Sequence, residues 1–102
     1  MSAIRFNENN FDSVRKNEGL SLIDFYADWC GPCRMVLPLV DEIAKERSDL
    51  LVGKINVNEN PDLAREFGIM SIPTLIVMKN GEIIKRSSGA KSKEKILEMI
   101  PA

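Results

Sequence analysis

Histidine is missing from this 102-residue chain, and cysteine occurs only twice, as Cys30 and Cys33. Without an imidazole, the chain cannot use Ser-His-Asp or Cys-His catalysis, and it cannot hold a histidine-ligated zinc ion. Two thiols are also too few for a four-thiolate metal site within one chain. Any acid–base chemistry must therefore depend on carboxylates, lysine, tyrosine or the thiols themselves.

Long apolar runs and a concentrated basic patch are missing too. No run approaches the roughly 18 residues of a membrane span, and the polar residues 1–10 lack the pattern of a secretory signal. The net charge is −1, which does not favour nucleic-acid binding. With 44% hydrophobic and 28% charged residues, the chain has the composition of a soluble domain. We therefore expect a single domain over residues 1–102, in the cytoplasm, with no membrane or nucleic-acid partner.

Strand-like and helix-like patterns alternate along the chain. The expected strands cover residues 3–6, 20–27, 50–57, 74–79 and 82–87, and the last two are joined by the hairpin turn Asn80-Gly81. Helices are expected after Asn10, over 30–47, over 61–68 and after Ser92, with Asn10, Asn60 and Ser92 as caps. Strands separated by helices pair in parallel, whereas a hairpin pairs antiparallel. The pattern predicts an α/β sandwich around a mixed sheet of about five strands.

The expected long helix over residues 30–47 has one apolar face. Its members are Met35, Val36, Leu39, Val40, Ile43 and Ala44. Pro38 lies within this pattern, and we expect it to kink the helix rather than to divide it in two.

The run Trp29-Cys30-Gly31-Pro32-Cys33 lies where a buried strand is expected to end and the long helix to begin. Free N–H groups and the helix dipole favour an anion at that position, and a thiolate is the form of cysteine that attacks a disulfide. Gly31 leaves the approach open and Pro32 suits the first helical turn. Because residues three apart share a helix face, the two sulfurs can bond. We interpret the pair as a redox-active disulfide.

Two other interpretations of Cys30 and Cys33 remain open. A purely structural disulfide would close a very short loop, and this constrains the unfolded chain by only about 2 kcal/mol. A metal site would need two chains, each supplying two thiolates.

Asp24 and Lys54 interrupt two strands that are otherwise apolar. A buried Asp has a raised pKa, and Asp24 is placed to lie beneath Cys33 and exchange a proton with it. Alternatively, Asp24 is a water-bound carboxylate at an edge or a kink. Lys54 either pairs with Asp24 or extends its ammonium group to the surface. Pro73, at the start of the fourth strand, follows either a trans or a cis peptide bond.

The sequence resembles the thioredoxin family in four places. These are the segment 24–33, DFYADWCGPC, the run Met70-Ser71-Ile72-Pro73-Thr74, and the turns Asn80-Gly81 and Gly89-Ala90. The resemblance extends over essentially the whole chain. It implies the thioredoxin fold, a central mixed five-stranded sheet in the order 1-3-2-4-5 sandwiched by four helices. It also implies no bound cofactor other than the redox-active disulfide Cys30–Cys33, and no metal.

By resemblance, Cys30 is the attacking thiolate and Cys33 the buried resolving thiol. Asp24 is the proton-transfer partner of Cys33, and Lys54 is its neighbour. Pro73 is cis and packs against the cysteine pair, while the backbone of Ile72 pairs with an extended substrate. The flat apolar patch that receives partners comprises Trp29, Gly31, Pro32, Ile72, Gly89 and Ala90.

The resemblance therefore implies a monomeric disulfide reductase that acts on protein disulfides and is recycled by a thioredoxin reductase, an NADPH-dependent flavoprotein. Tyr26 and Met70-Ser71 depart from the common residues of the family and flank the substrate groove, so they bear on partner choice. An oxidant or isomerase with the same fold is one alternative function. A binding module or complex subunit that uses the apolar patch is another, and it would tolerate serine at both cysteines.

Overall fold

The computed structural model describes residues 2–101. The elements, in chain order, are β1 (Ile4–Arg5), α1 (Asp12–Arg15), β2 (Leu20–Tyr26), α2 (Gly31–Glu46), β3 (Leu51–Asn56), α3 (Pro61–Glu66), β4 (Thr74–Lys79), β5 (Glu82–Ser88) and α4 (Lys93–Glu98). Each matches one of the segments expected from the sequence, although β1 is only two residues long and β5 extends one residue further than expected, to Ser88.

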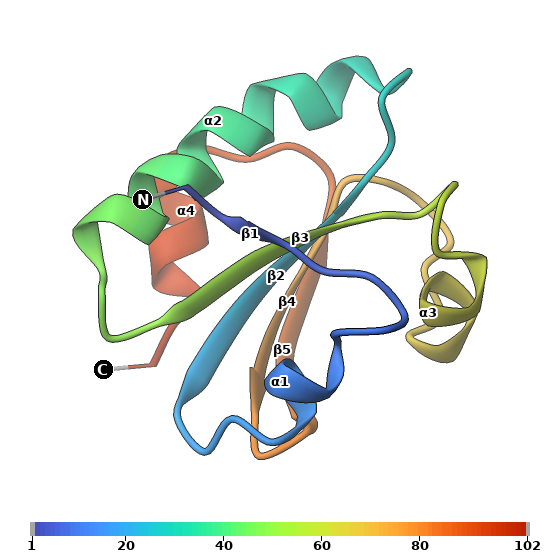
Figure 1. The fold of residues 1–102 in the computed structure, drawn as a ribbon. Helices are drawn as coiled ribbons and strands as arrows, with labels where there is room; N and C mark the ends of the chain where they lie inside the picture. Colours follow the sequence, from blue (N-terminus) through green and yellow to red (C-terminus); the bar gives the residue numbers. More distant parts are fainter. Residues whose placement is uncertain (1, 102) are drawn as a thin grey trace.

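The strands form one five-stranded sheet in the order β1-β3-β2-β4-β5, which confirms the predicted order (Figure 1). β1, β3 and β2 pair in parallel, whereas β4 and β5 are antiparallel to their neighbours. The central strand β2 is buried at every residue after Leu20, which explains its nearly continuous apolar sequence. Its charged exception is Asp24.

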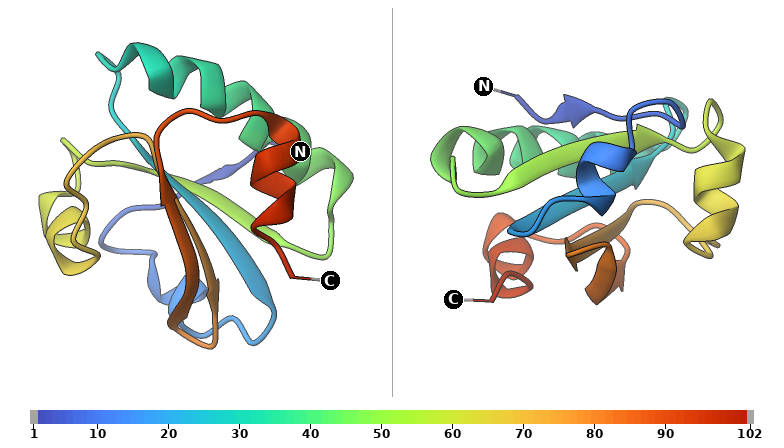
Figure 2. Two further views of the ribbon diagram at one scale, coloured as in Figure 1. Left: turned by 180° about the vertical axis from the view of Figure 1, so that it is seen from behind. Right: turned by 60° about the horizontal axis from the view of Figure 1, so that its bottom comes forward.

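Two helices cover each face of the sheet (Figure 2). The core between the sheet and helices α2 and α4 includes Leu22, Val36, Val40 and Ile96. The other core, on the α1 and α3 side, combines aliphatic side chains with the aromatic rings of Phe6, Phe11, Phe25 and Phe67. Within residues 2–101, no helix has both the length and the apolar character needed to cross a bilayer.

Helix α2 is not divided at Pro38, which confirms that part of the prediction. Val36, Val40 and Ile43 are buried, and Leu39 and Ala44 pack against them. Met35 was predicted on this buried face, and that prediction is wrong because its side chain is 69% exposed. It lies at the flank of the apolar stripe, beside Ala90 and Ser92 rather than under the sheet.

Of the predicted helix caps, Ser92 is confirmed, since its Oγ accepts a hydrogen bond from Lys95 N at 3.2 Å. Asn10 is not a cap. The residue preceding α1 is Phe11, and the Oδ1 of Asn10 instead accepts the backbone N–H of Asn7 at 2.6 Å. Asn7 itself forms an Asx turn, in which its Oδ1 accepts the backbone N–H groups of Asn9 at 2.8 Å and Asn10 at 3.1 Å. The Asn10 side chain is therefore held by the segment before α1 and is not available to the helix.

Asn60 precedes α3 with Pro61 in the first helical turn, as predicted, but its side chain does not cap the helix. Its amide instead joins two segments, accepting from Glu8 N at 3.1 Å and donating to Asn56 O at 3.0 Å. The free N–H of Asp62 donates to the carboxylate of Glu8 at 3.0 Å. The capping group therefore comes from a residue more than fifty positions away, which local sequence rules do not reveal.

The β4–β5 hairpin turns at Asn80 and Gly81, whose φ angles are +53° and +79°. Two successive left-handed residues are the signature of a type I′ turn, which matches the twist of the paired strands. The turn confirms the antiparallel pair expected from the sequence.

Candidate active site

The two cysteines lie at the start of α2, at the end of the molecule where β2 passes into that helix (Figure 1). Cys30 is the N-cap residue with extended backbone angles, and Pro32 occupies the first turn. The Sγ of Cys30 accepts the backbone N–H of Cys33 at 3.2 Å. The two residues form a disulfide, with their Cα atoms 5.3 Å apart. The motif thus has the predicted place, at the positive end of the helix dipole.

Both cysteines are buried in the disulfide form, but not equally. Cys33 is completely inaccessible, whereas 4% of Cys30 remains exposed. Cys30 is also followed by the exposed Gly31 and Pro32 and preceded by Trp29, whose side chain is 68% exposed. A reacting partner can therefore approach Cys30 from solvent, whereas Cys33 lies inside the protein.

The loop that precedes β4 forms the opposite wall of the site. Its Ile72–Pro73 peptide bond is cis, which confirms the expectation drawn from the resemblance. The carbonyl oxygen of Ile72 lies 3.8 Å from the Sγ of Cys30, and the half-buried Ile72 packs against the cluster of Tyr26, Ala27, Cys30 and Cys33. Pro73 itself is buried.

A second turn joins this wall. Gly89 has a φ of +93°, a conformation that suits glycine, and its N–H donates to the carbonyl of Pro73 at 2.8 Å. Ala90 follows, and both residues are exposed. The hydrogen bond holds the Gly89–Ala90 turn beside the Ile72–Pro73 loop. These two parts of the predicted partner patch are therefore fixed relative to each other.

Asp24 is completely buried in the central strand β2, so its interpretation as an edge carboxylate is wrong. Because alternate residues of a strand point to one face, Asp24 points to the same face as Leu22, which packs against α2. That helix also carries Cys33. Asp24 thus faces the layer that contains Cys33.

The carboxylate of Asp24 has no hydrogen-bond partner among residues 2–101. Burial raises the pKa of Asp24 to about 7, Lys54 opposes this rise, and the charge of Asp41 adds to it. A carboxyl group with that pKa can accept or release a proton near neutral pH.

Lys54 lies beside Asp24 in the register of β2 and β3, and it is half-buried. Within residues 2–101, however, no nitrogen of Lys54 is within ion-pair distance of Asp24, and the carboxylate is unbonded. The prediction that Lys54 is a neighbour of Asp24 is therefore confirmed. The structure does not show a direct ion pair between the two side chains. Lys54 acts on Asp24 through its charge alone, by favouring the ionised carboxylate.

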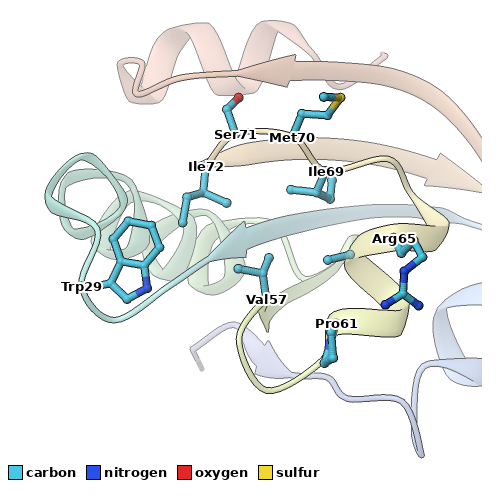
Figure 3. A pocket seen from close by; sticks show the side chains of 9 residues that line it. Trp29, Val57, Pro61, Arg65, Ile69, Met70, Ser71 and Ile72 are labelled. Atoms are coloured by element: carbon cyan, nitrogen blue, oxygen red, sulfur yellow. The ribbon is translucent and has the colours of Figure 1, made fainter.

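A groove of about 460 Å³ opens beside Trp29 and Ile72 (Figure 3). The remaining lining residues are Val57, Pro61, Ala64, Arg65, Ile69, Met70 and Ser71. Sequence analysis noted Met70 and Ser71 but missed the contribution of α3. The spacing of Pro61, Ala64 and Arg65 places them on one helix face, yet only the packing of α3 against the loop shows that this face lines a groove.

Over residues 2–101, no three cysteine, aspartate or glutamate side chains gather closely enough to hold a metal ion. The two sulfurs are joined to each other.

Comparisons with known proteins agree with this geometry. The thioredoxin family profile matches residues 2–102. The chain is 43% identical over 101 residues to a thioredoxin of Bacillus subtilis (strain 168), covering 98% of this chain and 96% of that protein. It is 54% identical over 77 residues to a thioredoxin of Mycobacterium tuberculosis (strain ATCC 25618 / H37Rv), covering 74% of this chain and 66% of that protein.

A solved structure is also similar, that of a mutant thioredoxin from Halobacterium salinarum NRC-1. Its TM-score is 0.89 at 35% sequence identity, and the match covers 97% of this chain and 88% of that one. The similarity therefore extends over nearly the entire chain rather than over the cysteine motif alone.

Proposed function

Because the chain belongs to the thioredoxin family and is a thiol–disulfide oxidoreductase, we propose that it acts as a general reductant of protein disulfides. The observation that carries the proposal is the position of Cys30, an N-cap residue whose sulfur receives the N–H of Cys33. The same N–H and the helix dipole stabilise a thiolate when the disulfide is reduced.

In the first step, the Cys30 thiolate attacks one sulfur of a substrate disulfide. A mixed disulfide forms between Cys30 and that sulfur, and the second substrate sulfur leaves as a thiolate, which takes a proton from water. Cys30 is assigned this role because it is the more accessible of the two cysteines.

In the second step, Cys33 loses its proton and attacks the sulfur of Cys30. The Cys30–Cys33 disulfide forms, and the first substrate sulfur leaves in its turn, so that one substrate disulfide has been reduced and one dithiol oxidised. Asp24 is assigned the acceptor of the Cys33 proton, since it is buried on the face toward α2 and has a pKa of about 7. Lys54 keeps that pKa from rising further.

Substrate binding is assigned to the walls of the site. The backbone of Ile72, whose carbonyl lies beside the Cys30 sulfur, pairs with an extended substrate segment. Pro73 fixes that backbone. The apolar patch of Trp29, Gly31, Pro32, Ile72, Gly89 and Ala90 receives the surrounding surface of the partner.

Regeneration completes the cycle. The oxidised protein accepts two electrons from a separate thioredoxin reductase, an NADPH-dependent flavoprotein, and it needs no cofactor of its own. We assign residues 1–102 to one domain that works as a monomer in the cytoplasm, where a reducing environment maintains the dithiol.

A stoichiometric assay tests the proposal. The protein is reduced with dithiothreitol, freed of reductant and mixed with an excess of a disulfide-bonded protein. We expect one substrate disulfide to be lost for each Cys30–Cys33 pair that forms, measured by alkylation of new thiols and mass spectrometry. Adding NADPH and a thioredoxin reductase should make the reaction continue beyond one turnover. If no substrate disulfide is reduced, the proposal is contradicted. If the protein in its disulfide form instead oxidises substrate thiols, the oxidant alternative is supported.

A further inference from the structure

The groove beside Cys30 is apolar except for one charged side chain and one hydroxyl. Of its nine lining residues, Arg65 alone is charged and Ser71 is the other polar residue. Trp29 lies at one end and Arg65 at the other, with Val57, Ile69 and Ile72 between them (Figure 3). Its volume of about 460 Å³ lies within the range of sites that bind small ligands or side chains. The groove therefore offers an apolar surface that ends in a positive charge.

Arg65 remains available to a partner. Its side chain is 75% exposed, and its one ion pair among residues 2–101 is with the exposed Asp62, at 2.8 Å through a single guanidinium nitrogen. Such exposed pairs contribute little, and a guanidinium has five N–H donors. The adjacent carboxylate of Glu66 does not compete, because Arg15 holds both of its oxygens, at 2.6 and 2.7 Å.

Met70 forms a flexible rim of the groove. Its side chain is 96% exposed, although it is large and apolar. Methionine has three rotatable bonds and a polarisable sulfur, so it adapts to apolar groups of different shape. It lies two residues before Ile72, whose carbonyl lies 3.8 Å from the Cys30 sulfur. An apolar side chain near a reacting disulfide can therefore be covered by Met70 without an exact fit.

We propose that this groove makes the protein prefer disulfides in which an apolar residue and an acidic residue lie within a few positions on one side of the reactive half-cystine. The apolar side chain enters between Trp29, Ile69 and Met70, and the carboxylate binds the guanidinium of Arg65. This inference rests on the proposed function, since it names the class of substrate that the same site reduces.

Model peptides test the preference directly. Each peptide carries one half-cystine in a disulfide with 2-mercaptoethanol, a leucine beside it, and Glu, Gln or Lys at each of the next three positions in turn. At low ionic strength we expect kcat/KM for the best Glu peptide to exceed that of its Gln counterpart by about 2- to 5-fold, with the Lys peptide slowest. The preference should shrink in 1 M salt, where charges are screened. Replacing the leucine by serine should lower kcat/KM roughly tenfold.

Charge reversal identifies the residue responsible. In Arg65→Glu the order should invert, so that the Lys peptide is reduced faster than the Glu peptide. Arg47→Glu is the matched control, because it makes the same change of charge at the far end of α2, roughly 26 Å along the helix from Cys30, where Arg47 is paired with Asp49. This variant should keep the wild-type preference.

Two results would overturn the inference: equal rates for the Glu, Gln and Lys peptides in the wild type, or an unchanged order in Arg65→Glu. Reduction of 2-hydroxyethyl disulfide, a small neutral substrate, distinguishes failure of the groove inference from failure of the proposed function. If the wild type reduces it but shows no peptide preference, the groove inference is wrong and the proposed function stands. If the wild type reduces neither substrate, the proposed function itself fails.

Discussion

Replacing Cys30 with serine is expected to lower the rate of protein-disulfide reduction by more than about 1,000-fold. A serine hydroxyl is almost fully protonated at neutral pH, and it cannot form the mixed disulfide on which the exchange depends. The measurement is reduction of a disulfide-bonded protein in the presence of NADPH and a thioredoxin reductase. A binding module would keep its partner affinity in this variant, so partner binding is measured on the same sample. Activity above one tenth of the wild type would contradict the assignment of Cys30 as nucleophile.

Cys33→Ser serves as the matched variant, because it removes the other sulfur of the pair. Here Cys30 still attacks, but nothing resolves the product, so we expect a stable mixed disulfide between Cys30 and the substrate. Mass spectrometry without reductant should find this adduct with Cys33→Ser and not with Cys30→Ser. The reverse pattern would exchange the roles of the two cysteines.

Burial of Asp24 should make the oxidised protein less stable as the pH rises from about 4 to 7. In the unfolded chain Asp24 ionises near pH 3.8, whereas in the folded protein its pKa is about 7. Between these values the folded state binds one more proton than the unfolded state, so the free energy of unfolding decreases with pH and levels off above pH 7. The shift corresponds to a total loss of about 4 kcal/mol. Urea unfolding followed by far-ultraviolet circular dichroism, at pH values from 5 to 8, measures the part of this loss that falls above pH 5, about 2–3 kcal/mol.

Asp24→Asn should remove this slope. Its buried amide lacks partners, which costs about 1–3 kcal/mol, so we expect a net gain in stability of about 1–3 kcal/mol at pH 8. The control Asp49→Asn removes an exposed carboxyl group whose pKa Arg47 lowers, and it should keep the wild-type slope over pH 5–8. An equal slope in the wild type and in Asp24→Asn would show that the pKa of Asp24 is not raised in the folded protein. Its carboxylate would then be too weak a base to accept the proton of Cys33 as described above.

Much of the fold was predictable because several local rules agree. The alternation of strands and helices, the Asn80-Gly81 turn and the Ser92 cap each depend on neighbouring residues, and each is confirmed. The position of the cysteine pair was predictable for the same reason, since a strand end and a helix start meet at Cys30. The sheet order came from the family resemblance, because strand patterns alone do not specify which strands are neighbours.

The features that sequence analysis missed depend on contacts between distant segments. Met35 fits the apolar helical pattern, yet it lies at the flank of the apolar stripe, exposed beside Ala90 and Ser92. Glu8 caps α3 across more than fifty residues, which displaces Asn60 from that role. Arg65 looks like an ordinary surface residue of a short helix until α3 is placed beside the loop that contains Met70. In each case the local sequence is compatible with more than one tertiary environment, and only the packing of distant segments determines which one the residue has.

The reduction potential of the Cys30–Cys33 pair tests the central claim most directly. The protein is equilibrated in graded dithiothreitol redox buffers, and the fluorescence of Trp29, the residue next to Cys30, reports the fraction reduced. For a general reductant of protein disulfides we expect a potential below that of the cellular glutathione pool, about −220 to −260 mV. A potential well above that range would identify an oxidant or isomerase and would contradict the proposed function.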